Sequence, residues 1–102
     1  MEAPSPAPAQ VLLIEDEAGD VELIRWQLLD ALHEHFVIHV ADSLRAAEVL
    51  LAGGGFQPDV VLLDLNLPDS FGPATVERCR ALTEAPIVVL AGLDDPATTS
   101  LA

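Results

Sequence analysis

No lysine occurs in this chain of 102 residues, and four arginines are its only strong bases. Against them stand 17 acidic residues, which give a formal net charge of −13 at pH 7. A surface of this sign repels the phosphate backbone of nucleic acids, so the composition argues against direct binding to DNA or RNA. The same charge favours cations or basic partner surfaces as ligands.

Cysteine and long apolar runs are also scarce. Cys79 is the only cysteine, so no internal disulfide can form, and we predict a protein of the reducing cytoplasm. No apolar run approaches the length of a membrane span, which argues against a membrane partner. Residues 1–10 carry neither a basic residue nor an apolar block, and their alternating Ala and Pro predict a disordered leader. Residues 11–102 are then long enough for one domain with a modest core.

Short apolar runs alternate with segments of helical periodicity in this domain. The runs predicted as strands are residues 10–14, 36–40, 59–63 and 86–90. The segments predicted as helices are residues 19–32, 43–51 and 73–82, with a last one opening at Asp94 or Asp95. Strands that are apolar throughout are typical of burial on both faces. We therefore predict an α/β domain with a parallel sheet covered by helices on both sides.

Acidic residues follow two of the predicted strands directly. Glu15 and Asp16 come after the first strand, and Asp64 comes after the third. The carboxyl ends of parallel strands lie side by side and form the usual ligand crevice of such sheets. Three carboxylates that converge there favour a hard divalent cation such as Mg²⁺, or Mn²⁺ in its place. Glu17 and Asp20 are better explained as acids that stabilise the start of the following helix.

Three segments carry a more specific pattern, which is Ile14-Glu15-Asp16-Glu17, then Asp64-Leu65-Asn66-Leu67-Pro68-Asp69-Ser70-Phe71-Gly72, then Pro86-Ile87-Val88-Val89-Leu90-Ala91-Gly92. In this order and spacing they resemble the receiver domain of bacterial two-component response regulators. The resemblance covers residues 11–102. It implies a flavodoxin-like, doubly wound parallel sheet with strand order 2-1-3-4, and a signalling module rather than an enzyme.

The resemblance also implies a role for each matching residue. Asp64 matches the phosphoacceptor, which takes a phosphoryl group from a histidine kinase, a phosphotransfer protein or a small phosphodonor. Asp16 matches a direct Mg²⁺ ligand, Glu15 matches an acid that acts through a metal-bound water, and the backbone carbonyl of Asn66 matches a further ligand. A metal fits this chemistry because phosphoryl transfer depends on positioning and on neutralising charge.

Two departures from the family pattern bear on the switch. Ala91 stands where the family has a Thr or Ser whose hydroxyl binds the phosphoryl group, and the family's lysine has no counterpart in the chain. The sequence also ends at Ala102, before a fifth strand and fifth helix, so we expect a C-terminally truncated domain with an impaired switch. The fourth strand would then be an edge strand, which predicts self-association through paired edges or an exchanged C-terminal segment.

Two other functions remain open at this stage. A receiver fold used only as a phosphorylation-independent docking module is favoured by Ala91 and by the missing lysine. A Mg²⁺-dependent phosphatase of the haloacid dehalogenase type also forms an aspartyl phosphate after a strand. That family has a second aspartate where this chain has Asn66, and it needs a lysine, so we regard the phosphatase as the weaker alternative.

Overall fold

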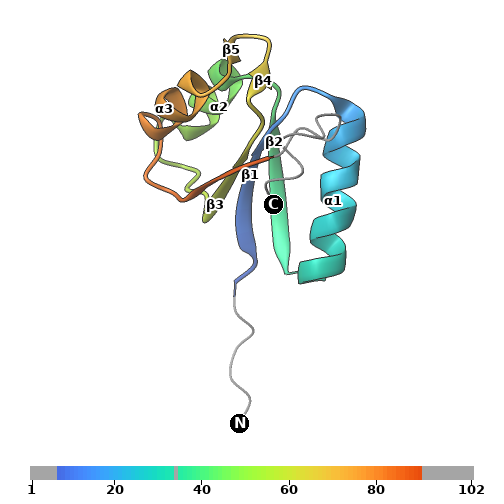
Figure 1. Cartoon of the computed structure of the whole chain (residues 1–102). Coiled ribbons are helices and arrows are strands. Elements are labelled where there is room, and N and C mark those ends of the chain that lie inside the picture. The colour runs from blue at the N-terminus through green and yellow to red at the C-terminus, as the bar shows by residue number, and fades with distance from the viewer. Residues whose placement is uncertain (1–6, 34, 91–102) are drawn as a thin grey trace.

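The computed structural model describes residues 7–33 and 35–90 (Figure 1). Strands and helices alternate along most of this range, as the apolar runs predict. The elements are β1 (Ala9–Ile14), α1 (Ala18–Leu32), β2 (Phe36–Ala41), α2 (Leu44–Leu51), β3 (Val60–Leu63), β4 (Asn66–Leu67), β5 (Ser70–Phe71), α3 (Ala74–Arg80) and β6 (Ile87–Val89).

Four of the strands form one parallel sheet in the order β2-β1-β3-β6. The strand β6 is the fourth of the predicted strands, so the predicted order 2-1-3-4 is confirmed. The last four residues of β1, Val11–Ile14, are buried, as expected for a central strand that is apolar on both faces. Among the described residues, no strand pairs with the outer edge of β6, where Val88 and Val89 are 49% and 42% exposed.

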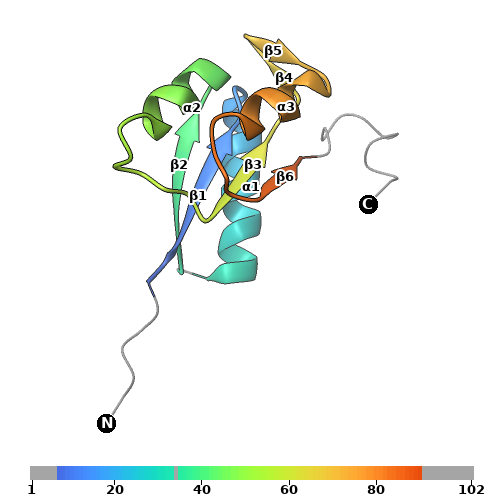
Figure 2. The ribbon, with the colours of Figure 1, turned by 90° about the vertical axis from the view of Figure 1, so that its left-hand side faces the viewer.

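Helices cover the sheet on both faces. One face carries α2 and α3 and the other carries α1, as Figures 1 and 2 show from two directions. Successive side chains of β1 point to opposite faces of the sheet, as they do along any strand. Leu12 and Ile14 enter the core under α2 and α3, and Leu13 packs with Val21 and Ile24 of α1.

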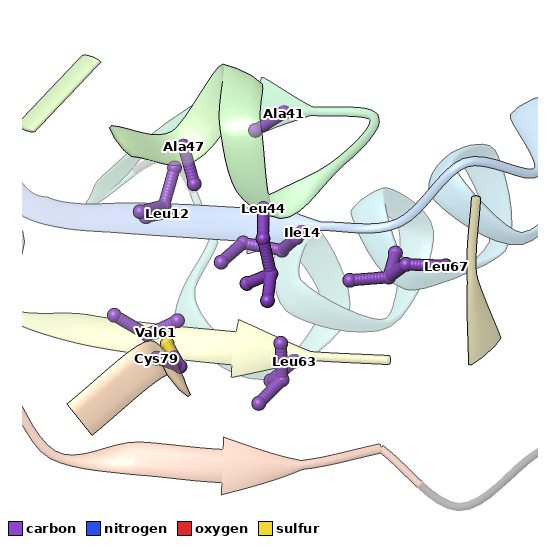
Figure 3. Close-up of a cluster of buried hydrophobic side chains, with 9 residues drawn as sticks. All are labelled: Leu12, Ile14, Ala41, Leu44, Ala47, Val61, Leu63, Leu67 and Cys79. Atoms are coloured by element: carbon purple, nitrogen blue, oxygen red, sulfur yellow. The ribbon is translucent and has the colours of Figure 1, made fainter. Parts of the chain in front are cut away.

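The larger of the two cores lies between the sheet and α2 and α3. Figure 3 shows its side chains pointing inward from β1, β3 and the two helices. Cys79 lies fully buried in this core, where it packs as a small apolar side chain. The fully buried members also include Leu63, which places the end of β3 at the base of the candidate site described below.

Local signals explain where α2 begins and ends. The Ser43 hydroxyl accepts a hydrogen bond from the backbone N–H of Ala46 at 3.0 Å, so Ser43 caps the start of the helix. Two glycines follow the helix with positive φ angles, +88° at Gly53 and +69° at Gly54, a conformation that glycine adopts without steric cost. The end of the helix before these glycines is therefore explained by the backbone itself.

The structure differs from the sequence-based expectations at the start of β1 and in the segment after β3. Strand β1 begins at Ala9, so Ala9 and Gln10 belong to the sheet rather than to a leader of residues 1–10; the Ala9 N–H donates to the carbonyl of His35 at 3.0 Å. Residues 66–71, which lie in none of the predicted strands or helices, form the antiparallel β4–β5 hairpin. Ala91 and the helix expected from Asp94 or Asp95 lie outside the described residues. In the described part of the chain, no helix is long and apolar enough to cross a membrane.

Candidate metal centre

Backbone pairing brings the acids of two strands to one edge of the sheet. Strands β1 and β3 run parallel with Ile14 opposite Leu63, and the pairing continues one step further because the Asp64 N–H donates to the Ile14 carbonyl at 3.0 Å. On the other side of β1, the Glu15 N–H donates to the Ala41 carbonyl at 2.9 Å. Glu15 and Asp64 are thus fixed by the sheet itself, at the carboxyl ends of neighbouring strands.

The side chains of Glu15, Asp16 and Asp64 form the acidic cluster. One carboxylate oxygen from each lies within 4.8 Å of the others. Glu15 is 5% exposed, Asp64 is half-buried and Asp16 is open to solvent. Within residues 7–33 and 35–90, no other group of three potential metal ligands gathers in this way.

The donor set of the cluster fits a hard divalent cation. All three groups offer oxygen, the ligand atom that Mg²⁺ and Mn²⁺ prefer over the nitrogen and sulfur favoured by zinc. The mixture of buried and exposed carboxylates leaves one side open to water, which Mg²⁺ retains readily when it binds to proteins.

The electrostatics of Glu15 point the same way. Burial raises the pKa of Glu15 from its ordinary 4.5 to about 7, although a hydrogen bond from the Glu17 N–H, at 3.2 Å, favours the charged form. A side-chain hydrogen bond with Asp64 and the negative charges of Asp64 and Asp20 raise the pKa further. Without a cation, the cluster therefore holds a proton in place of one negative charge below about pH 7. A divalent cation would relieve the same repulsion.

The fourth predicted ligand, Asn66, lies in the hairpin that follows the cluster. Asn66 pairs with Phe71 and Leu67 pairs with Ser70, and the Gly72 N–H closes the loop by donating to the Leu65 carbonyl at 2.8 Å. Figures 1 and 2 both place this hairpin beyond the carboxyl end of β3. The backbone carbonyl of Asn66 is therefore carried by a closed hairpin that starts two residues after Asp64.

Sequence reasoning missed one residue of this region, Asp69. Its two carboxylate oxygens accept hydrogen bonds from the backbone N–H groups of Leu44, at 3.0 Å, and Arg45, at 2.9 Å. Burial of the Asp69 carboxyl opposes its ionisation, but these N–H groups and the nearby Arg78 outweigh that effect, so the pKa of Asp69 is lowered. The sequence held one signal for this contact, because the start of any helix leaves several N–H groups that need acceptors. Asp69 lies 25 residues after Leu44 and 24 residues after Arg45, and capping rules consider only residues next to the helix.

Comparisons with known proteins agree with this geometry. The sequence model of the response regulator receiver domain matches residues 11–102. Response regulator Rcp1 of Synechocystis sp. is 33% identical over 90 residues, which span 81% of this chain and 61% of Rcp1. Protein-glutamate methylesterase/protein-glutamine glutaminase 3 of Rhodospirillum rubrum is 30% identical over 86 residues, which span 84% of this chain and 22% of the relative.

A solved structure is similar as well. The structure of the phosphorylated cyanobacterial phytochrome response regulator RcpA superimposes with a TM-score of 0.69 at 26% identity, and the match covers 86% of this chain and 69% of that one. The fold similarity thus extends over most of the chain, whereas the curated relatives are longer, and the chain spans only about three fifths of Rcp1.

Proposed function

We propose that this chain, which belongs to the response regulator receiver domain family, accepts a phosphoryl group on Asp64 beside a Mg²⁺ ion. The observation that carries the proposal is the convergence of Glu15, Asp16 and Asp64, whose carboxylate oxygens lie within 4.8 Å of one another. These three side chains would hold the cation, together with the backbone carbonyl of Asn66. The relative RcpA is described as phosphorylated, which supports phosphoryl transfer as the chemistry of this fold.

The transfer itself needs few protein groups. An ionised Asp64 oxygen forms a bond to the phosphorus of a phosphohistidine or a small acyl phosphate, while the bond from phosphorus to the donor nitrogen or oxygen breaks and the electron pair leaves with the donor. The product on Asp64 is a mixed anhydride. When bound, Mg²⁺ supplies positive charge that offsets the repulsion between this carboxylate and the incoming anion. The hydrogen bond from the Asp64 N–H to Ile14 keeps the nucleophile at the edge of the sheet.

One departure from the family pattern concerns the response after transfer. Ala91 offers no hydroxyl at the position where the family has Thr or Ser. A hydrogen bond to a charged group contributes roughly 1.5–3 kcal/mol, enough to shift a two-state equilibrium by an order of magnitude or more. We therefore infer that phosphorylation changes the conformation of this chain only weakly.

Partners and setting follow from the same proposal. A histidine kinase or phosphotransfer protein would supply the phosphoryl group in the cytoplasm, and the chain would act as a signalling module rather than as an enzyme. The methylesterase relative carries an enzymatic name, but the match spans only 22% of its length. Within residues 7–33 and 35–90, no strand pairs with the outer edge of β6, and Val88 and Val89 are exposed there, which supports self-association through paired edges.

Phosphodonor labelling tests the proposal directly. Incubation with acetyl phosphate and Mg²⁺, followed by intact-mass measurement, should add one phosphoryl group to the wild-type chain. Asp64→Asn should add none, and chelation of Mg²⁺ with EDTA should suppress the adduct. Labelling that persists in Asp64→Asn would show that the phosphoacceptor has been misassigned.

The docking module is the second candidate function, because Ala91 weakens the phosphorylation response. It predicts no adduct under the same conditions. Turnover of several phosphate esters without a stable adduct would instead favour the phosphatase alternative, in which Asp64 is a transient nucleophile.

A further inference from the structure

The β4–β5 hairpin is fastened to both helices on its side of the sheet. Asp69, at its turn, accepts hydrogen bonds from two backbone N–H groups at the start of α2. The Arg78 guanidinium of α3 donates to the Asp69 carbonyl at 2.6 Å, and the Ser70 hydroxyl shares a 2.7 Å hydrogen bond with the Thr75 hydroxyl. Thr75 is fully buried, so this last contact is shielded from water.

Asp69 and Ser43 accept hydrogen bonds from different backbone N–H groups at the start of α2. The first N–H groups of a helix lack partners inside the helix. Ser43, directly before the helix, serves the N–H of Ala46, while Asp69 serves those of Leu44 and Arg45. The Asp69 carboxylate also lies at the positive end of the helix dipole, where a negative charge is stabilised. Ser43 therefore caps the helix from the residue directly before it, and Asp69 caps it from the hairpin that follows Asp64.

We propose that Asp69 is a positioning residue that couples the acidic cluster to the start of helix α2. The coupling runs through the hairpin, because Asp69 stands at the turn and the pairs Asn66–Phe71 and Leu67–Ser70 close it. Leu67 is buried in the core under α2 and α3, so the hairpin has little freedom to move while Asp69 stays bound. The inference rests on the proposed function, since it takes the Asn66 carbonyl as a ligand of the cation.

Coupling of this kind is reciprocal. If the Asp69 contact holds the hairpin in the arrangement that binds the cation, then the cation must strengthen the Asp69 contact by the same factor. The N–H groups of Leu44 and Arg45 should thus become better protected when the cluster is filled. The start of α2 would then respond when the acidic cluster is filled. This response would not need residue 91, the position that the family uses for its switch.

A competing explanation for a lower cation affinity is the loss of negative charge alone, and other residues of the chain provide control variants for it. Removing any carboxylate from a chain of net charge −13 lowers its attraction for a cation. Asp42→Asn removes one exposed negative charge next to the start of α2 and leaves Asp69 in place. Ser43→Ala removes the other cap, so it weakens α2 and leaves the hairpin untouched.

Mg²⁺ titration of the full chain, followed by amide chemical shifts, gives the affinity of each variant. Loss of residues that orient metal ligands directly lowers affinity roughly 10–100-fold, and Asp69 acts one step further away, so we expect a loss of roughly 3–10-fold for Asp69→Ala. Asp69→Asn, which retains one acceptor oxygen, should fall between this variant and wild type. Asp42→Asn should stay within about 2-fold of wild type, since it leaves the Asp69 contacts in place, and Ser43→Ala, which loosens the same helix start, should lose less affinity than Asp69→Ala.

Amide hydrogen exchange supplies the readout that a merely structural role would not change. In wild type, Mg²⁺ should slow exchange at Leu44 and Arg45, whereas in Asp69→Ala it should leave them unaffected. Equal Mg²⁺ affinity in wild type and both Asp69 variants would overturn the coupling but leave the proposed metal site standing. An affinity loss in Asp42→Asn as large as that in Asp69→Asn would replace coupling by bulk charge. A wild-type chain that binds no Mg²⁺ would overturn both the coupling and the metal site.

Discussion

Glu15→Gln should stabilise the metal-free protein at alkaline pH, although it removes a residue from the candidate site. Glu15 is 5% exposed and faces the charge of Asp64, so its ionised form is costly in the folded state. Glutamine keeps the shape of the side chain and an oxygen that can accept the hydrogen bond from the Glu17 N–H. The substitution therefore removes the charge and little else.

The magnitude follows from the pKa of Glu15, which is raised from 4.5 to about 7. One unit of pKa corresponds to about 1.36 kcal/mol, so this rise in the pKa is equivalent to about 3 kcal/mol of folding free energy. Solvent on the open side of the cluster reduces this contribution to about 1–2 kcal/mol. Because the folded state binds the proton more tightly than the unfolded state, this contribution is present below pH 4.5. It is lost as the pH rises through 7.

Urea unfolding followed by circular dichroism, in EDTA, measures the difference between the two proteins. We expect similar free energies of unfolding near pH 4.5 and a more stable Glu15→Gln at pH 8, by about 1–2 kcal/mol, with most of the divergence between pH 4.5 and 7. Each kcal/mol corresponds to roughly 4–8 °C in melting temperature for a domain of this size. A constant difference between the two proteins from pH 4.5 to 8 would refute the argument. Saturating Mg²⁺ should reverse the order at pH 8, because only wild type retains the full ligand set.

Three further changes test other parts of the structure. Asp16→Ala should abolish the Mg²⁺-dependent amide shifts, whereas Glu17→Ala, one residue outside the acidic cluster, should retain them; equal responses would remove Asp16 from the site. Cys79→Ser should lower the free energy of unfolding by about 1–3 kcal/mol, because it places a hydroxyl in the larger core, and urea titration measures the loss. Burial also raises the pKa of the Cys79 thiol, so labelling by a disulfide reagent at pH 8 should be slow until urea unfolds the chain. Ser43→Ala should lower stability by about 1 kcal/mol in the same assay, since the N–H of Ala46 loses its acceptor; an unchanged midpoint would show that water replaces this cap.

The sheet was predictable because its signal is local in the sequence. The central strands β1 and β3 are mostly continuous apolar runs, and burial on both faces of a parallel sheet requires that composition. The acids at Glu15, Asp16 and Asp64 come directly after two such runs, so the rule that parallel strands end at one edge was enough to bring them together. The capping role of Ser43 was readable for the same reason, because its partner lies three residues away.

The rest depends on contacts between distant segments. The hairpin consists of two strands of two residues each, too short for an alternating pattern to show. The Asp69 contacts join a turn to a helix start that lies far back in the chain. The raised pKa of Glu15 likewise arises from burial and from the approach of Asp64, neither of which composition reveals. The strand predicted from residue 10 starts one residue earlier, because Ala9 pairs with Phe36 of β2 and its N–H donates to the His35 carbonyl.

The unequal covering of the two sheet faces has a consequence for local unfolding. Among the described residues, α1 covers its face alone, with a buried core of Leu13, Val21 and Ile24, and it leaves Leu32 40% exposed. Segments with few buried apolar contacts open at lower free energy than the rest of a domain. We expect α1 to detach in excursions that leave the opposite layer folded. Glu15 and Asp16 precede this helix directly, whereas Asp64 follows β3, so the acidic cluster spans a weakly held segment and a firmly held one. A cation bound across that boundary would suppress the opening of α1.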